Sequence, residues 1–127
     1  MPARRDQRGA AVVDFVLVLV LLVPMFLGVL QVALVLFVRN TITAAASEGA
    51  RYGATSGRGP ADGAARTRSQ IGGALAGRYA SGVSAHEVTL DGARVVEVTV
   101  HVVVPALGLG GPSVAFDVSG HAVEEEQ

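Results

Sequence analysis

The longest pattern in the chain is an apolar run, Phe15–Val38, in which 24 consecutive residues carry no formal charge. At a rise of ~1.5 Å per residue, a helix of this length measures ~36 Å, which is enough to cross a hydrocarbon core of ~30 Å once. A helix in the core of a soluble protein would show a polar face, whereas the run has Gln31 as its one polar side chain. The pattern predicts a transmembrane helix over residues 10–38. Pro24 and Gly28 lie inside it, and a kink is expected there because Pro24 removes a backbone donor.

The sequence after the apolar run favours a helix that continues outside the membrane. Residues 40–55 contain no proline and several alanines, and alanine has the highest helix propensity. The segment S-G-R-G-P at 56–60 should end the helix. We therefore expect a helical stalk in solvent over residues 39–56, with Glu48 and Arg51 as a surface pair three positions apart.

The remaining residues, 57–127, contain the patterns of one helix and three strands, followed by an acidic tail. Apolar positions near one helical face predict an amphipathic helix over residues 61–80. An Asp-Gly pair, which is a favoured two-residue hairpin turn, separates a strand at 87–90 from a longer one at 94–104. In the amphipathic helix predicted over residues 61–80, the apolar face consists of Ala64, Ile71, Ala74, Leu75 and Tyr79.

Valine alternates along the second strand, which predicts that one of its faces is buried. These valines are Val96, Val98, Val100, Val102 and Val104, opposite Glu97, Thr99 and His101. A glycine-rich segment, 108–112, leads to a third strand at 114–118. The predicted fold class is α+β: a single N-terminal transmembrane helix extended into a stalk, then a small domain with one amphipathic helix and a three-stranded antiparallel sheet.

Composition limits the size and chemistry of this domain. The chain has 127 residues, and the part after the predicted stalk can form only one small domain. The absence of cysteine excludes disulfides and thiolate sites. With a net charge of −1, bulk attraction to nucleic acid is not expected, and Glu124–Glu126 is read as a solvated acidic tail.

Catalytic residues are not indicated by any motif in the chain. His86, His101 and His121 are far apart in sequence, and none has a second metal ligand at helix or hairpin-turn spacing. The glycines at 108–111 lack the Gly-Lys-Ser/Thr ending of a phosphate-binding loop. We expect a protein that is not an enzyme, with no catalytic residues, no metal and no cofactor, and with its histidines on the surface.

The residues before the apolar run suggest an orientation and a special site. Three arginines precede the run and only Arg39 lies close on its far side, which favours a cytoplasmic N-terminus and an extracytoplasmic C-terminal domain. Asp14 stands at the entrance of the run. An unpaired Asp at the membrane centre costs ~2.5–3.5 kcal/mol on insertion scales, and less near the interface, so this isolated carboxylate is expected to have a partner or a role. The three arginines that precede the apolar run are Arg4, Arg5 and Arg8.

This arrangement resembles the processing site of type IV pilin-like proteins. A basic leader ends at Gly9, Ala10 begins the apolar segment, and Asp14 and Phe15 become mature residues five and six. The family usually has Glu and Phe at those two positions. The resemblance implies that a membrane-embedded prepilin peptidase removes residues 1–9 by cutting between Gly9 and Ala10.

Two later motifs resemble the TadE-like family, the minor pseudopilins of the tight-adherence (Flp pilus) system. One is the Gly-Val-Leu-Gln step that ends at Gln31, where the family typically has an acid. The other is the alanine-rich stretch that ends in Glu48, Gly49, Ala50, Arg51 and Tyr52. The resemblance implies a bacterial cell-membrane protein that takes part in assembly of a Flp-type pilus or a related secretion apparatus. The implied partners are a prepilin peptidase, other pilins and pseudopilins, the assembly platform and the lipid bilayer, and the protein can also enter a pilus.

Cleavage would give Asp14 a partner. The new amine of Ala10 lies four residues away on the same helix, and Asp14 can pair with it or with the amine of a neighbouring subunit, which would align the helices. Two alternatives remain open from the sequence. One is a signal-anchored extracytoplasmic binding module that keeps its N-terminus, and the other is a secreted module cut by a signal peptidase after the alanines at 44–46.

Overall fold

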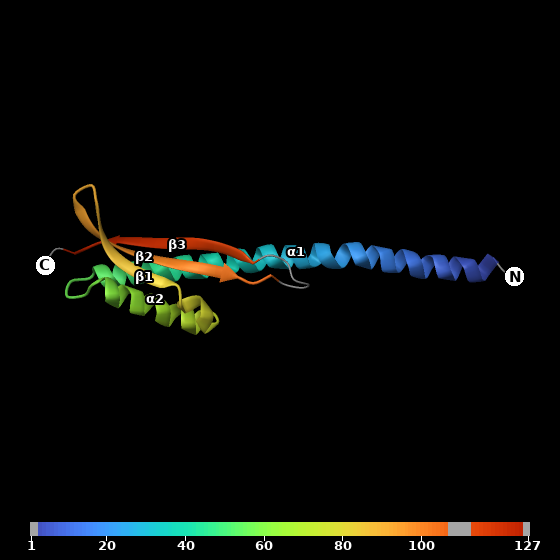
Figure 1. The fold of residues 1–127 in the computed structure, drawn as a ribbon, viewed down its shortest axis with the longest axis horizontal. Helices are drawn as coiled ribbons and strands as arrows, with labels where there is room; N and C mark the ends of the chain where they lie inside the picture. Colours follow the sequence, from blue (N-terminus) through green and yellow to red (C-terminus); the bar gives the residue numbers. More distant parts are fainter. Residues whose placement is uncertain (1–2, 107–112, 126–127) are drawn as a thin grey trace.

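The computed structural model describes residues 3–106 and 113–125 of the chain. Figure 1 shows one long helix along the whole molecule, with a second helix and a sheet gathered around the half of it that lies away from the N-terminus. The elements are α1 (Ala3–Ala54), α2 (Pro60–Ala74), the 3-10 helix η1 (Gly77–Ala80), β1 (Val83–Leu90), β2 (Ala93–Val104) and β3 (Val114–Val123). The predicted α+β fold class is confirmed.

The sheet is an antiparallel meander in the order β1-β2-β3. Asp91 and Gly92 connect β1 to β2 with φ angles of 50° and 83°, as a type I′ hairpin turn requires. The predicted hairpin is confirmed, although β1 starts at Val83, four residues before the expected 87. The third strand is also longer than expected and ends at Val123. The glycine-rich segment 108–112 lies outside the described residues.

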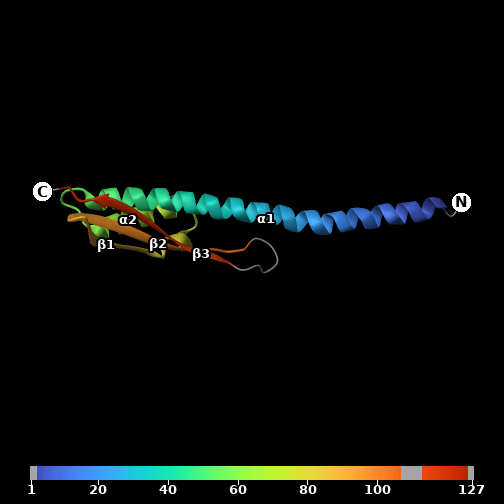
Figure 2. The same cartoon turned by 90° about the horizontal axis from the view of Figure 1, so that it is seen from above.

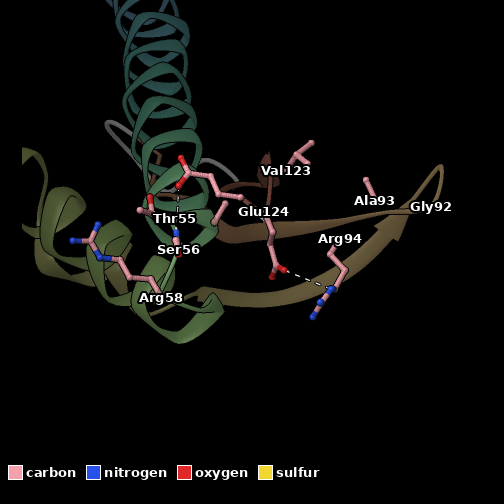
Figure 3. Close-up of a pocket in the computed structure, with 10 residues that line it drawn as sticks. Thr55, Ser56, Arg58, Gly92, Ala93, Arg94, Val123 and Glu124 are labelled. Atoms are coloured by element: carbon pink, nitrogen blue, oxygen red, sulfur yellow. Dashed lines mark hydrogen bonds and ion pairs between the residues drawn. The ribbon is translucent and has the colours of Figure 1, made fainter. Parts of the chain in front are cut away.

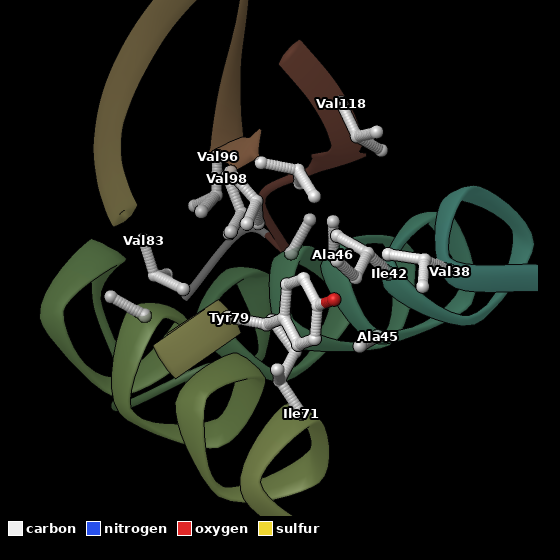
Figure 4. Close-up of a cluster of buried hydrophobic side chains, with 14 of the residues drawn as sticks. Val38, Ile42, Ala45, Ala46, Ile71, Tyr79, Val83, Val96, Val98 and Val118 are labelled. Carbon is white, nitrogen blue, oxygen red and sulfur yellow. The ribbon is translucent and has the colours of Figure 1, made fainter. Parts of the chain in front are cut away.

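One face of the sheet packs against both helices, and the other face is open (Figures 1 and 2). The alternating valines of β2 point toward the helices, and each is at most 1% exposed. Ile42 of α1, Ile71 of α2 and Tyr79 of η1 meet them in a single cluster (Figure 4). The predicted buried face of β2 is therefore confirmed.

The segment that was expected to be a free stalk is instead the central element of this core. Val38, Ile42, Ala46 and Ala50 are all buried against the sheet and α2. Alanine therefore has a second role beyond helix propensity, because its small side chain lets a strand and a helix approach α1 closely. The prediction of a helix past the apolar run is right, and the prediction that it stands in solvent is wrong.

The second helix is shorter than predicted. Pro60 occupies its first turn, and the Asp62 carboxylate accepts a hydrogen bond of 2.9 Å from the Gly59 N–H just before it. After Ala74 the backbone becomes extended at Leu75, with φ −132° and ψ 175°, so one helix to residue 80 is wrong. Two consecutive glycines in its last turn weaken the helix, since each costs about 1 kcal/mol relative to alanine.

The N-terminal part of α1 is long and apolar enough to cross a membrane, and its apolar side chains from Val12 to Leu30 are largely exposed. These features indicate a single-pass membrane anchor. The helix continues through Pro24 without a break. The folded domain contacts α1 at Gln31, whose Nε2 donates a 3.2 Å hydrogen bond to the carbonyl of Pro105, the residue after β2. Part of the predicted span of 10–38 therefore packs against the folded domain.

Candidate functional site

The predicted processing residues lie near the start of α1, on its exposed surface. Gly9 and Ala10 fall within the helix, six and seven residues after its first residue, Ala3. In a helix the Gly9 carbonyl accepts a hydrogen bond from the residue four positions later. A peptidase would have to unwind this turn, and glycine makes that easier because it lowers helix stability by about 1 kcal/mol relative to alanine.

Asp14 and Phe15 follow one turn later, and both are exposed. Ala10 and Asp14 are four residues apart in a continuous helix, so they share one face. The Phe15 side chain is 64% exposed and is available to contact lipid or another helix.

Gly28 leaves a shallow apolar hollow on the exposed side of α1. A Cβ built on Gly28 would meet nothing within 4 Å, and the hollow has a volume of ≈ 500 Å³. It is lined by Met25, Gly28, Val29, Val32, Ala33 and Leu36. A hollow of this chemistry fits an apolar side chain or a lipid tail.

The TadE-like motif at the end of α1 contacts α2. Glu48 pairs with Arg66 at 3.2 Å, and not with Arg51 as the sequence spacing suggested. Hydrogen bonding from Gln70, and then from Arg66, lowers the pKa of the Glu48 carboxyl. The ionised form of Glu48 therefore helps to hold the two helices together.

Gly49 allows the helices to approach to backbone contact. A Cβ at Gly49 would overlap the Thr67 hydroxyl and lie 2.7 Å from the Gly63 carbonyl oxygen. Thr67 is fully buried there, and its hydroxyl is within hydrogen-bond distance of the carbonyls of Gly63 (2.9 Å) and Ala45 (3.3 Å). A glycine at position 49 is thus required by the packing of α2 on α1.

Tyr52 completes the contact through cation–π interactions. The Arg58 guanidinium lies 3.9 Å from the centre of the Tyr52 ring, and that of Arg66 lies 5.5 Å from it. The motif therefore docks α2 onto α1. Arg58, Arg66 and Thr67 were missed as members of this site because they lie in a different segment, and their alignment with the motif depends on the turn between the helices.

The end of the chain forms a second cluster of contacts, at the end of the molecule away from the N-terminus. An open cavity of ≈ 610 Å³ lies between the end of α1, the β1–β2 turn and the last described residues. Figure 3 shows the residues that line it. The Glu125 N–H donates to the Ala54 carbonyl at 2.9 Å, and Glu124 pairs with Arg94 at 3.8 Å. The expectation of a solvated tail is wrong for Glu124, which is half-buried. The Glu125 side chain is exposed as expected, although its backbone N–H is bonded to the end of α1, and Glu126 lies outside the described residues.

Glu124 is held in a setting that disfavours its charge. Loss of hydration raises the pKa of the Glu124 carboxyl, and the neighbouring Glu87 carboxyl raises it further, against the opposing effect of Arg94. The folded state therefore binds the proton of the Glu124 carboxyl more tightly than the unfolded state does. The contribution of the protonated carboxyl to folding stability is fully present below the ordinary pKa of 4.5, and it is lost as the pH rises through the folded-state pKa.

Glu124→Gln is accordingly expected to raise the thermal unfolding midpoint at pH 7 and to have little effect at pH 4, because the carboxyl is already protonated there. Glu48→Gln is the matched control and is expected to lower the midpoint at pH 7, since the pKa of Glu48 is shifted in the opposite direction. The measurement is circular dichroism of the full chain in detergent micelles. An equal effect of Glu124→Gln at both pH values would contradict the assignment.

The open face of the sheet carries all three histidines of the chain. His86, Glu97 and His121 are register partners across the three strands, and both imidazoles contact the Glu97 carboxylate, with His86 Nε2 at 3.1 Å. His101 Nδ1 lies 2.6 Å from the Asp117 carboxylate. The histidines are exposed, as predicted, but the strand register gives each a carboxylate partner that sequence spacing did not reveal.

No group of three or more histidine, aspartate or glutamate side chains within residues 3–106 and 113–125 is arranged to hold a metal ion. The histidine–carboxylate row lies on a surface rather than in a cleft.

Comparison with known protein families gave a match over part of the chain. The family described as TadE-like protein matches residues 9–51, which run from the predicted cleavage glycine to the arginine of the α2-docking motif. Neither the curated proteins nor the solved structures gave a match. The matched segment coincides with the apolar helix and its buried continuation, and the family and the helix together fit a membrane protein associated with the Tad pilus. Residues 9–51 of this chain are therefore TadE-like, which confirms the resemblance indicated by the motifs.

Proposed function

We propose that this chain is a minor pseudopilin-like protein that takes part in assembly of a Flp-type (tight-adherence) pilus or a related secretion apparatus. The observation that carries the proposal is the TadE-like match over residues 9–51, on a helix that also packs into a folded domain. In this proposal the chain is the substrate of a prepilin peptidase and not itself a catalyst. Its partners are other pilins and pseudopilins, the assembly platform and the bilayer.

Cleavage between Gly9 and Ala10 would create the assembly-competent form. It removes the arginine leader and leaves an ammonium group at Ala10, one turn from the carboxylate of Asp14. In a low-dielectric setting an isolated carboxylate is costly, so pairing with the amine of the same or a neighbouring chain favours one helix register. The exposed Phe15 and the hollow at Gly28 supply apolar packing surface along the same helix.

The contribution of α1 to the core supports this reading over a secreted module. Signal-peptidase cleavage before Ser47 would remove Val38, Ile42 and Ala46, each of which is at most 1% exposed. The domain would then lose one side of its core. A pseudopilin keeps the whole segment after processing.

The N-terminus of the protein made in its native host tests the proposal. We expect the intact mass to correspond to a chain that begins at Ala10, and to a chain with its leader when the prepilin peptidase is absent. Gly9→Leu is expected to block cleavage, because a bulky side chain replaces the glycine at the scissile bond. A leader retained in the presence of the peptidase would contradict the proposal and favour a signal-anchored binding module, and a start at Ser47 would favour the secreted module.

Asp14 is tested separately from cleavage. Asp14→Asn is expected to be processed normally but to be recovered less with the other pilus components after crosslinking, while Asp14→Glu keeps the charge and the association. Equal recovery of the Asn variant and the wild type would remove Asp14 from the proposed mechanism.

A further inference from the structure

The folded domain extends back along α1 into the apolar run. Gln31 donates to the Pro105 carbonyl at 3.2 Å, and Leu34 and Val35 pack against the core. Figure 2 shows the end of β2 and the start of β3 lying beside α1 at this level, well toward the N-terminus from the rest of the sheet. No linker therefore separates the apolar helix from the domain.

The length of a membrane span sets where the bilayer must end. About 20 apolar residues cross the hydrocarbon core. A span that starts at Ala10 ends near Leu30, and one that starts at Phe15 ends near Leu34. In both cases the lipid boundary falls at or beyond the level of the Gln31–Pro105 contact.

Exposed apolar side chains lie at this level on both the sheet and α1, although Arg78, Ser81, His101 and Ser113 line the hollow beside Val103 and Pro105. On the sheet, Val103 is 46% exposed and Val114 is 39% exposed, and on α1, Leu36 and Phe37 are 51% and 59% exposed. These side chains, Leu36, Phe37, Val103 and Val114, are together with Pro105 called the basal surface below. Val103 is on the open face of the sheet, and Val114 is on the face that packs against the helices, since its register partner Val104 is 0% exposed. Exposed apolar side chains of α1 precede the basal surface along the helix, up to Val32, which is 60% exposed.

Arg39, the first charged residue after the apolar run, is exposed and fits a lipid boundary at this level. Arg39 lies eight residues beyond Gln31, which is ~12 Å along the helix. Arginine at this depth can extend its guanidinium toward lipid phosphates while its alkyl chain stays against apolar surface.

We propose that the basal surface rests in the interfacial region of the bilayer, so that the lipid contacts the sheet as well as the helix. The partner is the lipid bilayer itself, and the contact requires only that α1 spans it. Cleavage at Gly9 is not needed. Two contacts with the membrane, one through α1 and one through the ends of β2 and β3, would limit tilting of the domain.

The chain has no cysteine, so single cysteines can carry a nitroxide label without further changes. Labels are placed at Val103 and Val114, at Val123 as a matched control on the far end of β3, and at Leu21 as a reporter of the span. Val123 and Leu21 are 64% and 73% exposed. The full chain is reconstituted in vesicles of phosphatidylcholine and phosphatidylglycerol, and collision rates with oxygen and with a water-soluble nickel chelate are measured.

We expect high oxygen and low nickel accessibility at positions 21, 103 and 114, and severalfold higher nickel accessibility at 123. If position 21 reports lipid while 103 and 114 match 123, the basal surface faces water and the proposal fails, although α1 still spans the membrane. If 103 and 114 are shielded from both reagents, protein and not lipid covers them, and the proposal also fails. Because unprocessed protein is used, the result is independent of the cleavage experiment.

Discussion

Gly120→Ala is expected to lower the free energy of unfolding by about 3 kcal/mol, at the upper end of what an extra methyl group costs in a packed core. A Cβ on Gly120 would lie 2.5 Å from both the Ala46 carbonyl carbon and the Ser47 nitrogen, and 2.6 Å from the Ala46 oxygen. These are backbone atoms of α1, and they cannot rotate away as a side chain would. Relief would require β3 to lift from the helix, which would open the core.

Gly72→Ala is the matched control, since it makes the same chemical change at an open position. Nothing lies within 4 Å of a Cβ built on Gly72, which is in the last turn of α2. Alanine there is expected to stabilise the protein by about 0.5–1 kcal/mol through helix propensity. Denaturant unfolding of the full chain in micelles, followed by circular dichroism, measures both. If the two variants shift stability in the same direction, β3 does not lie directly against α1.

Ile42→Ala is expected to cost about 3 kcal/mol, within the range for truncating a buried isoleucine. Ile42 is 0% exposed and lies in the core with Ile71 and the β2 valines. The loss combines the transfer free energy of the removed carbons with the cavity left behind. The same unfolding measurement applies.

Asn40→Ala provides the comparison on the exposed side of the same helix. It is expected to change stability by no more than about 0.5 kcal/mol, as is usual for surface substitutions. A helix that stood free in solvent would respond weakly to both changes. Equal small effects of Ile42→Ala and Asn40→Ala would therefore contradict the packing of α1 into the domain.

Local patterns were enough to predict most elements of this fold. Alternation of valine in β2 identified its buried face, and the Asp-Gly pair identified the hairpin, because each signal is set by backbone geometry over a few residues. The apolar run likewise predicted the N-terminal helix. The shortened α2 was missed because the balance between Gly72, Gly73 and the apolar positions that follow is decided by packing on the core.

Contacts between distant segments could not be predicted in this way. The alanines after the run signal helix propensity whether they face solvent or a sheet, and contacts with distant segments, such as that of Gly120 with Ala46, distinguish the two. Glu48 had a plausible partner at Arg51, yet Arg66 lies closer once α2 folds back. The row of His86, Glu97 and His121 appears only when three strands are in register.

The helix α1 passes without interruption from its exposed apolar half into the core. The direction in which the sheet lies around the helix axis is therefore fixed relative to the side chains of the apolar half. Each residue of an α-helix advances the rotation by about 100°. One residue inserted between Val12 and Leu30 would therefore swing the histidine-bearing face about a third of a turn relative to Asp14. The number of residues in the apolar segment thus sets the rotation of the domain about the helix axis as well as its distance from Asp14 along that axis.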